Sequence, residues 1–318
     1  MLDIQRHNII AALCSRIPLY LNQRIMKRTP QLKKRILTII SSYSIILLGL
    51  LHSLGASMMF QANAQGKSSF IVKREQSDNE KYQLIWSDDF NASGTFDSSK
   101  WSYADRGQVA WNKFLTSSER YVSMDGNNLN LRMDNAVIAN DAVPYHSGGI
   151  QSKGKFSLTY GRVEVRAKFT QGRGSWPAIW MMPEPSKSYG TWPNCGEIDI
   201  MEHVNNESLI HHSIHNAKVT NASGGTTATQ QVAYEKEAFN VYSIEWEPTS
   251  IQFFVNDVLQ YTYRKDAGAT WEQWPFDVPF YIILNQSGGA GWPGPITDAD
   301  PPFSMQVDYV RVYKKPHR

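Results

Sequence analysis

Cysteine is scarce in this sequence: the 318 residues include two, Cys14 and Cys195. Cys14 lies in an N-terminal segment that we expect to be removed, which leaves Cys195 without an intramolecular partner. The chain is therefore not a disulfide scaffold. With 42% hydrophobic residues it can bury a sizeable core without such bonds, and Cys195 is predicted to pack as a small apolar side chain.

Positive charge is sparse outside the N-terminus. The formal net charge is +3, but residues 1–64 contain eight Lys and Arg against one Asp, so residues 65–318 carry a formal charge of −4. No basic stripe is found in this body. A mildly acidic protein has no electrostatic reason to bind the phosphate backbone of a nucleic acid, so we expect no nucleic-acid partner.

A sustained helical period is missing as well, and Pro and Gly punctuate nearly every gap between apolar runs. The runs are short and alternate apolar with polar residues. This pattern predicts one all-β domain over residues 81–315, a sandwich or barrel without internal repeats. The clearest predicted strands cover Asn128–Met133, Gly161–Phe169, Glu197–Val204, Tyr242–Trp246, Ile251–Val255, Phe280–Leu284 and Met305–Tyr313.

The long apolar run of the sequence, Ile36–Phe60, stands near the N-terminus, between a cluster of Lys and Arg and the small-residue segment Ala62–Ala64. This order is typical of a signal peptide. We expect residues 1–64 to be a leader, cleaved after its last residue, with 1–25 an over-called start. An uncleaved membrane anchor is the alternative, since the run is long enough to span a bilayer. Residues 65–80 are polar and predicted to be a linker, and the mature protein is expected free of the membrane, in the periplasm or outside the cell.

Aromatic residues are plentiful, with ten Trp and fifteen Tyr. Flat rings suit the apolar faces of sugars, but large buried aromatics would explain many of them equally well. Composition alone leaves both roles open.

The segment Glu197–Glu202 places three carboxylates on one predicted strand. Because side chains alternate between the faces of a strand, Glu197 and Asp199 would share a face, while strict alternation would bury Glu202. A β-bulge at Ile200–Met201 resets the phase and returns Glu202 to that face. Retaining glycoside hydrolysis requires two carboxylates about 5–5.5 Å apart. Crowding should keep at least one carboxyl protonated near neutral pH, and Asp199 should hydrogen-bond to Glu197.

Two other interpretations of this strand are open. An acidic, solvent-facing strand is the simpler one, but the surrounding Trp-rich segments favour a functional cleft. Metal catalysis is the other, because His203, His211, His212 and His215 follow closely. Alternation would put His211 and His215 on one strand face and His212 on the other, and no zinc-like spacing emerges.

Several short segments stand in order along the body: Trp86–Phe90, Ser147–Ile150, Tyr160–Arg166, Trp176–Met181, Trp192–Pro193, Gly196–Glu202, Trp292–Gly294 and Val307–Tyr313. Together they resemble glycoside hydrolase family 16, in its bacterial laminarinase and mixed-linkage glucanase branch. The resemblance covers the whole body. It implies a concanavalin A-like jelly-roll sandwich of two curved antiparallel sheets, with a glucan lying across the concave one.

The resemblance also implies roles for individual residues. Glu197 would be the nucleophile, Glu202 the acid/base and Asp199 the assisting carboxylate. The two residues between Asp199 and Glu202 mark the bulged form, which differs from that of lichenases. The side chains expected to bind substrate are Trp176, Trp180, Trp192 and His215, together with Trp111 and Asn112.

A structural calcium ion on the convex face is a further implication of the resemblance, with Asp308 as a ligand. Asp308 could equally cap a strand end or pair with Arg311. No cofactor is expected to be required for catalysis.

The resulting prediction is a secreted, monomeric, retaining endo-β-glucanase. Its expected partner is a β-glucan polysaccharide, cut at internal β-1,3 or β-1,4 bonds of β-1,3-glucan (laminarin) or mixed-linkage β-1,3-1,4-glucan. One alternative is a galactanase of the same family, of the agarase, porphyranase or carrageenase type. Sulfated galactans would call for Arg or Lys in the cleft, and Arg173 is the nearest base to the aromatic segments. The other alternative is a carbohydrate-binding sandwich without catalysis.

Overall fold

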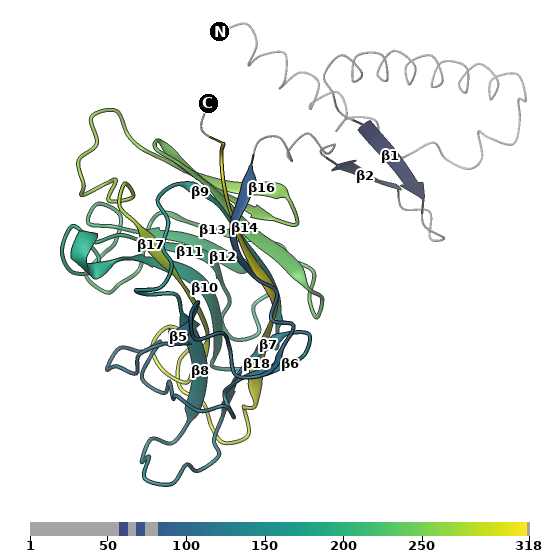
Figure 1. The fold of residues 1–318 in the computed structure, drawn as a ribbon, viewed down its shortest axis with the longest axis vertical. Helices are drawn as coiled ribbons and strands as arrows, with labels where there is room; N and C mark the ends of the chain where they lie inside the picture. Colours follow the sequence, from purple (N-terminus) through teal and green to yellow (C-terminus); the bar gives the residue numbers. More distant parts are fainter. Residues whose placement is uncertain (1–56, 63–67, 74–81, 317–318) are drawn as a thin grey trace, which may run out of the picture. The chain divides into compact units, whose positions relative to one another are not determined.

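The structure, a computed structural model, describes residues 57–62, 68–73 and 82–316. The chain divides into two compact units, Met1–Asp78 and Asn79–Arg318. Strands make up nearly all of the regular structure of the second unit (Figure 1).

The described part of the first unit is an antiparallel hairpin, β1 (Ser57–Ala62) paired with β2 (Ser68–Lys73). Most of the expected leader, residues 1–64, lies outside the described residues and stays a prediction. The boundary of the linker, 65–80, also stays a prediction, and β2 falls within it. In the described parts of the chain, no helix has the length and apolar character needed to cross a membrane.

Sixteen strands and one short 3-10 helix, η2 (Pro185–Lys187), are described in the second unit. The strands are β3 (Gln83–Asp88), β4 (Ser93–Gly94), β5 (Ser102–Tyr103), β6 (Val122–Asp125), β7 (Leu129–Asp134), β8 (His146–Gln151), β9 (Gly161–Phe169), β10 (Ser175–Pro183), β11 (Glu197–Glu202), β12 (Ile210–His215), β13 (Thr229–Val232), β14 (Asn240–Glu247), β15 (Ser250–Val255), β16 (Val258–Arg264), β17 (Phe280–Gly288) and β18 (Phe303–Lys314).

The sheet order is β13-β12-β11-β10-β17-β8-β7-β18-β9-β14-β15-β16, and the named strand pairs are antiparallel. The path folds over at the short β7–β8 pairing, where Met133 lies opposite Ser147 and Asp134 opposite His146. One layer therefore runs from β8 to β13, and the other from β7 to β16. This arrangement confirms the antiparallel jelly-roll sandwich expected from the sequence.

The core lies between the two layers, and β9 shows how one face of a strand enters it. In β9, Val163, Val165 and Ala167 are fully buried, whereas the residues between them are half-buried. Val307 and Val310 of β18 and residues of β11 and β12 join the same apolar cluster. Burying one such aliphatic side chain stabilises the fold by about 1.5–3 kcal/mol. Because Ile198, Ile200 and Met201 of β11 face this core, the opposite face of the β8–β13 layer is left for the cleft.

The strands predicted from the alternating pattern are all present, with ends shifted by a few residues. The largest difference is at β17, which continues to Gly288 instead of ending at Leu284. Its additional residues, Asn285–Gly288, are polar or glycine and are buried, and Asn285 lines the cleft. Polar residues in a fully buried strand give no alternating pattern, so sequence periodicity missed them.

Candidate active site

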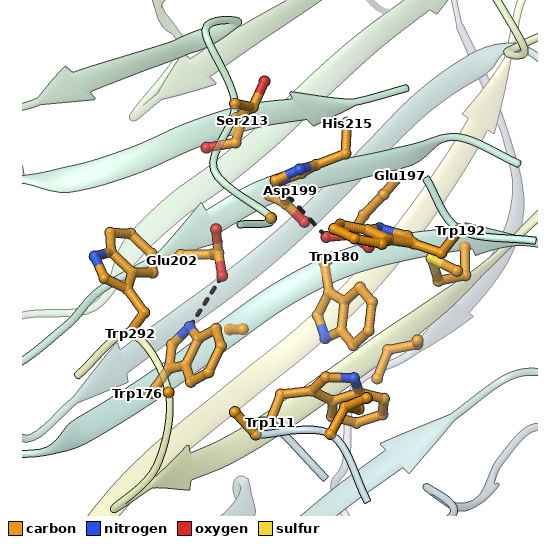
Figure 2. Close-up of a pocket in the computed structure, with 18 of the residues that line it drawn as sticks. Trp111, Trp176, Trp180, Trp192, Glu197, Asp199, Glu202, Ser213, His215 and Trp292 are labelled. Atoms are coloured by element: carbon orange, nitrogen blue, oxygen red, sulfur yellow. Dashed lines mark hydrogen bonds and ion pairs between the residues drawn. The ribbon is translucent and has the colours of Figure 1, made fainter. Parts of the chain in front are cut away.

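A cleft of about 1400 Å³ lies on the exposed face of the β8–β13 layer. Its floor comes from β10, β11, β12 and β17, and its walls come from loops around residues 105–112, 221–226 and 291–292. Figure 2 shows Glu202 beside Trp176 and Trp292, and Glu197 and Asp199 beside Trp192 and His215. The three carboxylates of β11 therefore open into the cleft, where aromatic rings surround them.

The expected β-bulge is present in β11. Asp199 pairs with Trp180 of β10 and Met201 pairs with Ile179, so the register skips Ile200. Ile198, Ile200 and Met201 are buried in the core, and Glu202 lines the cleft. The extra residue thus returns Glu202 to the face of Glu197, as alternation with one added residue requires.

Gly196 enters β11 with a φ of +84°, a left-handed conformation in which a side chain would be strained. A Cβ atom here would also lie 2.8 Å from Cγ of Pro275. Glycine therefore lets the chain turn tightly into Glu197. The adjacent Cys195 is buried, and burial, followed by the charge of Glu197, raises its pKa to about 11. Its thiol stays protonated, which agrees with packing and not chemistry.

Two indole N–H groups hold the glutamates. Trp192 Nε1 donates to Glu197 Oε2 at 2.8 Å, and Trp176 Nε1 donates to Glu202 Oε1 at 2.9 Å. Hydrogen bonds to an ionised acceptor are stronger than neutral ones. Each glutamate is thus oriented by a separate tryptophan.

His215 completes a cluster with the first two carboxylates. Its Nε2 lies 3.3 Å from Asp199 Oδ2 and 3.9 Å from Glu197 Oε1. A side-chain hydrogen bond between Asp199 and Glu197, expected from the sequence, is also present. Asp199 therefore bridges His215 and Glu197 from a fully buried position.

Burial raises the pKa of all three carboxyls. The pKa values of Glu197 and Asp199 are raised well above the ordinary range, with the charge of Asp199 adding to the effect on Glu197 and the charge of Glu202 adding to the effect on Asp199. The pKa of Glu202 is raised by burial and lowered in part by the Trp176 hydrogen bond and by His215. The cluster consequently retains a proton near neutral pH, as general acid catalysis needs.

All six side chains predicted to bind substrate line the cleft: Trp111, Asn112, Trp176, Trp180, Trp192 and His215. They differ in exposure. Trp192 is 42% exposed, whereas Trp180 is 6% exposed and donates through Nε1 to Asn285 Oδ1 at 2.7 Å. Trp111 meets Trp180 edge to face. Trp192 thus offers a free ring surface, and Trp180 belongs to the floor. Substrate contact itself stays a prediction.

Sequence reasoning gave no role to two parts of the cleft. Trp292 stands in the Trp292–Gly294 segment that supports the family resemblance, and it is 47% exposed and lies against the rings of Trp176 and His211. The loop 221–225 forms the other wall, where a Cβ on Gly224 would lie 3.4 Å from the Trp192 ring. This loop is held by its own Asn221 side chain, and no sequence signal connects it to Trp192.

The metal interpretations find little support among the described residues. The rings of His203 and His212 bond to backbone carbonyls. The potential ligands that lie close enough together to hold an ion are Glu197, Asp199 and His215, which form the carboxylate site itself. Asp308 pairs with the guanidinium of Arg166 and not with Arg311. A carboxylate occupied by a cationic side chain does not fit a calcium ligand. Calcium binding stays a prediction without support from this geometry.

A curved antiparallel sandwich with paired glutamates in an aromatic-lined cleft is typical of a glycosidase. The family model described as glycosyl hydrolases family 16 matches residues 109–311. The chain belongs to this family and is a glycoside hydrolase, as its sequence resemblance indicated.

Three known proteins illustrate the similarity. The chain is 68% identical over 235 residues to a keratan-sulfate endo-1,4-β-galactosidase from Sphingobacterium multivorum, a match that covers 74% of the chain and 56% of that relative. It is 40% identical over 252 residues to a β-glucanase from Rhodothermus marinus, covering 73% of the chain and 85% of the relative. The solved laminarinase of R. marinus superposes with a TM-score of 0.68 at 35% identity, covering 74% of the chain and 98% of that structure. The chain thus spans little more than half the length of the galactosidase.

Proposed function

We propose that this chain is a retaining, endo-acting glycoside hydrolase that cuts internal β-1,4-galactosidic bonds in keratan-sulfate chains. The observation that carries the choice of substrate is the 68% identity to a keratan-sulfate endo-1,4-β-galactosidase, against 40% to a β-glucanase. This choice places a β-galactosidic substrate, as in the galactanase alternative of the sequence analysis, ahead of a β-glucan substrate.

The proposed reaction is a double displacement on the β11 face. Glu197 attacks the anomeric carbon while Glu202 gives its proton to the departing glycosidic oxygen, forming a covalent glycosyl-enzyme. Glu202, now ionised, then takes a proton from a water molecule, which attacks the same carbon and releases Glu197. Asp199 is buried beside a second carboxylate, which raises its pKa, so a proton held on Asp199 supports Glu197 without adding a negative charge.

The charge of the cleft limits which galactose units fit at the cut bond. Of the described residues that line the cleft, Lys153 is the one Lys or Arg, and it lies 3.6 Å from Asp105. Arg173 is not in this lining and pairs with Asp300 instead. A sulfate beside the ionised Glu197 would meet like charge without a free cation to compensate. We therefore propose cleavage next to unsulfated galactose.

A second candidate is internal cleavage of β-1,3-glucan or mixed-linkage β-glucan. It is favoured by the tryptophans of the cleft, which can stack on neutral glucose units, and by the likeness to the R. marinus laminarinase. Secretion through the predicted leader and a monomeric state are parts of the same proposal that rest on the sequence.

The test is a digest of five polymers by the purified protein: keratan sulfate, chemically desulfated keratan sulfate, laminarin, barley mixed-linkage glucan and agarose. We expect oligosaccharides from both keratan samples, with a faster rate on the desulfated one. A Glu197→Ala preparation is the matched control for contaminating hydrolases. Rapid cleavage of laminarin with both keratan samples intact would overturn the substrate choice and establish the second candidate.

A further inference from the structure

The bulge in β11 has a specific partner on the neighbouring strand. The β11–β12 register shifts between Asp199 and Glu202, so Ile200 and Met201 together lie opposite the single residue His212. This two-against-one pairing is the geometry of a β-bulge. His212 is therefore the β12 residue that faces the irregular part of the carboxylate strand.

The His212 side chain contacts the bulge directly from the core side. It is fully buried, and its Nδ1–H donates to the carbonyl oxygen of Ile200 at 2.6 Å. Its ring lies 5.2 Å from the ring of Phe253 on β15. Its neighbours His211 and Ser213 point the other way and line the cleft.

We propose that His212 is a positioning residue for the acid/base: its bond to the Ile200 carbonyl holds the bulge, and the bulge holds Glu202 in the cleft. Alternation without the extra residue would turn Glu202 into the core. The bulge therefore sets the distance between the carboxyl groups of Glu202 and Glu197, which retaining hydrolysis fixes to about 5–5.5 Å.

Simple space filling does not explain a histidine at this position. Nε2 of His212 is buried without a hydrogen-bond partner among the described residues. Burial lowers the pKa of the ring to about 4, so the ring is neutral at working pH and its one proton stays on Nδ1. An apolar side chain would fill the same space without an unpaired nitrogen. What the imidazole adds is the donor to Ile200.

The test compares His212→Asn, His212→Leu and His212→Gln with the wild-type enzyme. The amide nitrogen of Asn can take the place of Nδ1, whereas Leu fills the space without a donor. The amide of Gln lies one bond farther from the backbone than Nδ1 does. Phe253→Leu is the packing control, because it disturbs the same contact and keeps the histidine. Circular dichroism and Tm report folding for each variant.

Comparing the rates on two substrates distinguishes a displaced Glu202 from a general loss of structure. One is the polymer that the wild-type enzyme cleaves, whose leaving sugar needs a proton. The other is a dinitrophenyl glycoside of the oligosaccharide released from it, whose leaving group needs none. The value of kcat/KM reports the step in which Glu202 acts as an acid.

We expect His212→Leu to lose at least about tenfold in kcat/KM on the polymer, since general acid catalysis contributes ~10²–10⁴-fold. On the dinitrophenyl glycoside we expect a loss below about threefold, because no proton has to be transferred to that leaving group. His212→Asn should stay close to wild type on both substrates, and His212→Gln should resemble His212→Leu. Phe253→Leu should lower Tm and leave the ratio of the two rates unchanged.

Three outcomes would each overturn the inference. His212→Leu could lose activity equally on both substrates or remain unaffected, or His212→Asn could be as impaired as His212→Leu. If His212→Leu does not fold, the contrast between His212→Asn and His212→Gln decides. The inference rests on the proposed role of Glu202 and not on the choice of polymer. Wild-type activity after Glu202→Gln would refute that role, whereas an inactive Glu202→Gln enzyme beside a normal His212→Leu enzyme would refute this inference alone.

Discussion

Trp192 donates its indole N–H to Glu197 at a distance of 2.8 Å while 42% of its surface stays exposed to the cleft. One residue thus offers a ring to the substrate and a hydrogen bond to the proposed nucleophile. The two functions can be separated by mutation.

Trp192→Phe keeps a flat ring and removes the donor. The hydrogen bond favours the ionised form of Glu197, so its loss should raise the pKa of that carboxyl further. Because the nucleophile must be ionised, the acidic limb of the kcat/KM profile should move to higher pH. A hydrogen bond to a charged group contributes about 1.5–3 kcal/mol, so we expect kcat/KM at the optimum to fall about tenfold or more.

The control for Trp192→Phe is Trp271→Phe. Trp271 is 40% exposed, stacks on Tyr189 and lies outside the residues that line the cleft. Its variant should keep the wild-type pH profile. An unshifted acidic limb in Trp192→Phe would show that the indole N–H does not act on Glu197.

External azide can assign the two glutamates. Glu202→Ala should lose at least about a hundredfold in turnover, and azide should restore much of it on an activated aryl glycoside, because the anion attacks the intermediate without a general base. The product should be a β-glycosyl azide, after two inversions. Glu197→Ala with azide should instead yield the α-azide, after one inversion.

Proton NMR of the azide products checks this assignment. The reverse pattern would exchange the roles of Glu197 and Glu202. An inverted product from the wild-type enzyme with water would exclude the covalent intermediate altogether.

The carboxylate strand shows how far sequence reasoning reached into the site. A bulge was required because alternation would otherwise bury Glu202, and the structure contains it. Trp176 and Trp192 were found because they stand in Trp-rich segments that precede the strand and support the family resemblance. Trp292 and the loop 221–225 received no role, because their approach to the cleft depends on the packing of loops that carry no periodic signal.

Substrate class was harder to predict than fold. The alternating strands specify a sandwich because each must bury one face, whereas tryptophans stack on galactose and glucose alike. Arg173 was the nearest base in the sequence, but it pairs with Asp300. Among the described residues, the cation that does line the cleft is Lys153, which follows the end of β8. Which cations face a substrate depends on tertiary packing and not on local sequence.

The layers meet at β7–β8, and the buried carboxylate of Asp134 should stabilise this junction. It accepts hydrogen bonds from Tyr121 Oη at 2.6 Å, Arg132 Nε at 2.8 Å and Arg120 at 2.9 Å. Burial alone would raise its pKa, but these donors outweigh burial and hold the pKa well below its usual value. We expect Asp134→Asn to lower the free energy of unfolding by about 1.5–3 kcal/mol at neutral pH.

The effect of Asp134→Asn should depend on pH. A carboxyl with a lowered folded-state pKa stabilises the fold above its unfolded pKa, and this contribution is lost as the pH falls below about 4. Urea titrations should therefore show a large difference from wild type at pH 7 that narrows at pH 3. Asp89→Asn, which breaks a surface pair with Arg311, is the control and should cost less than about 1 kcal/mol. A difference that stays constant with pH would contradict the role of the ionised carboxylate.

Asp199 should have the opposite effect on stability, because its pKa is raised in the folded state by burial and by the charge of Glu202. At a pH below its unfolded pKa the carboxyl is protonated in both states and carries no penalty. As the pH rises above that value, the unfolded chain ionises more readily than the folded one, and the fold loses stability. Asp199→Asn removes this penalty, so the variant should be more stable than wild type at pH 7 to 8 and equally stable near pH 3.

The same substitution should lower activity, since an amide cannot exchange a proton with Glu197. We expect a Tm higher by a few degrees at neutral pH, because ~1 kcal/mol corresponds to ~2–4 °C for a domain of this size, together with a loss of about tenfold or more in kcat. Asp105→Asn, which alters an exposed carboxylate of the same cleft, should change neither Tm nor its pH dependence. Thermal melts from pH 3 to 8 measure the difference. An Asp199→Asn enzyme less stable than wild type at pH 7 would show that the buried carboxylate stabilises the fold. It would contradict the expectation that the site lowers stability in exchange for catalysis.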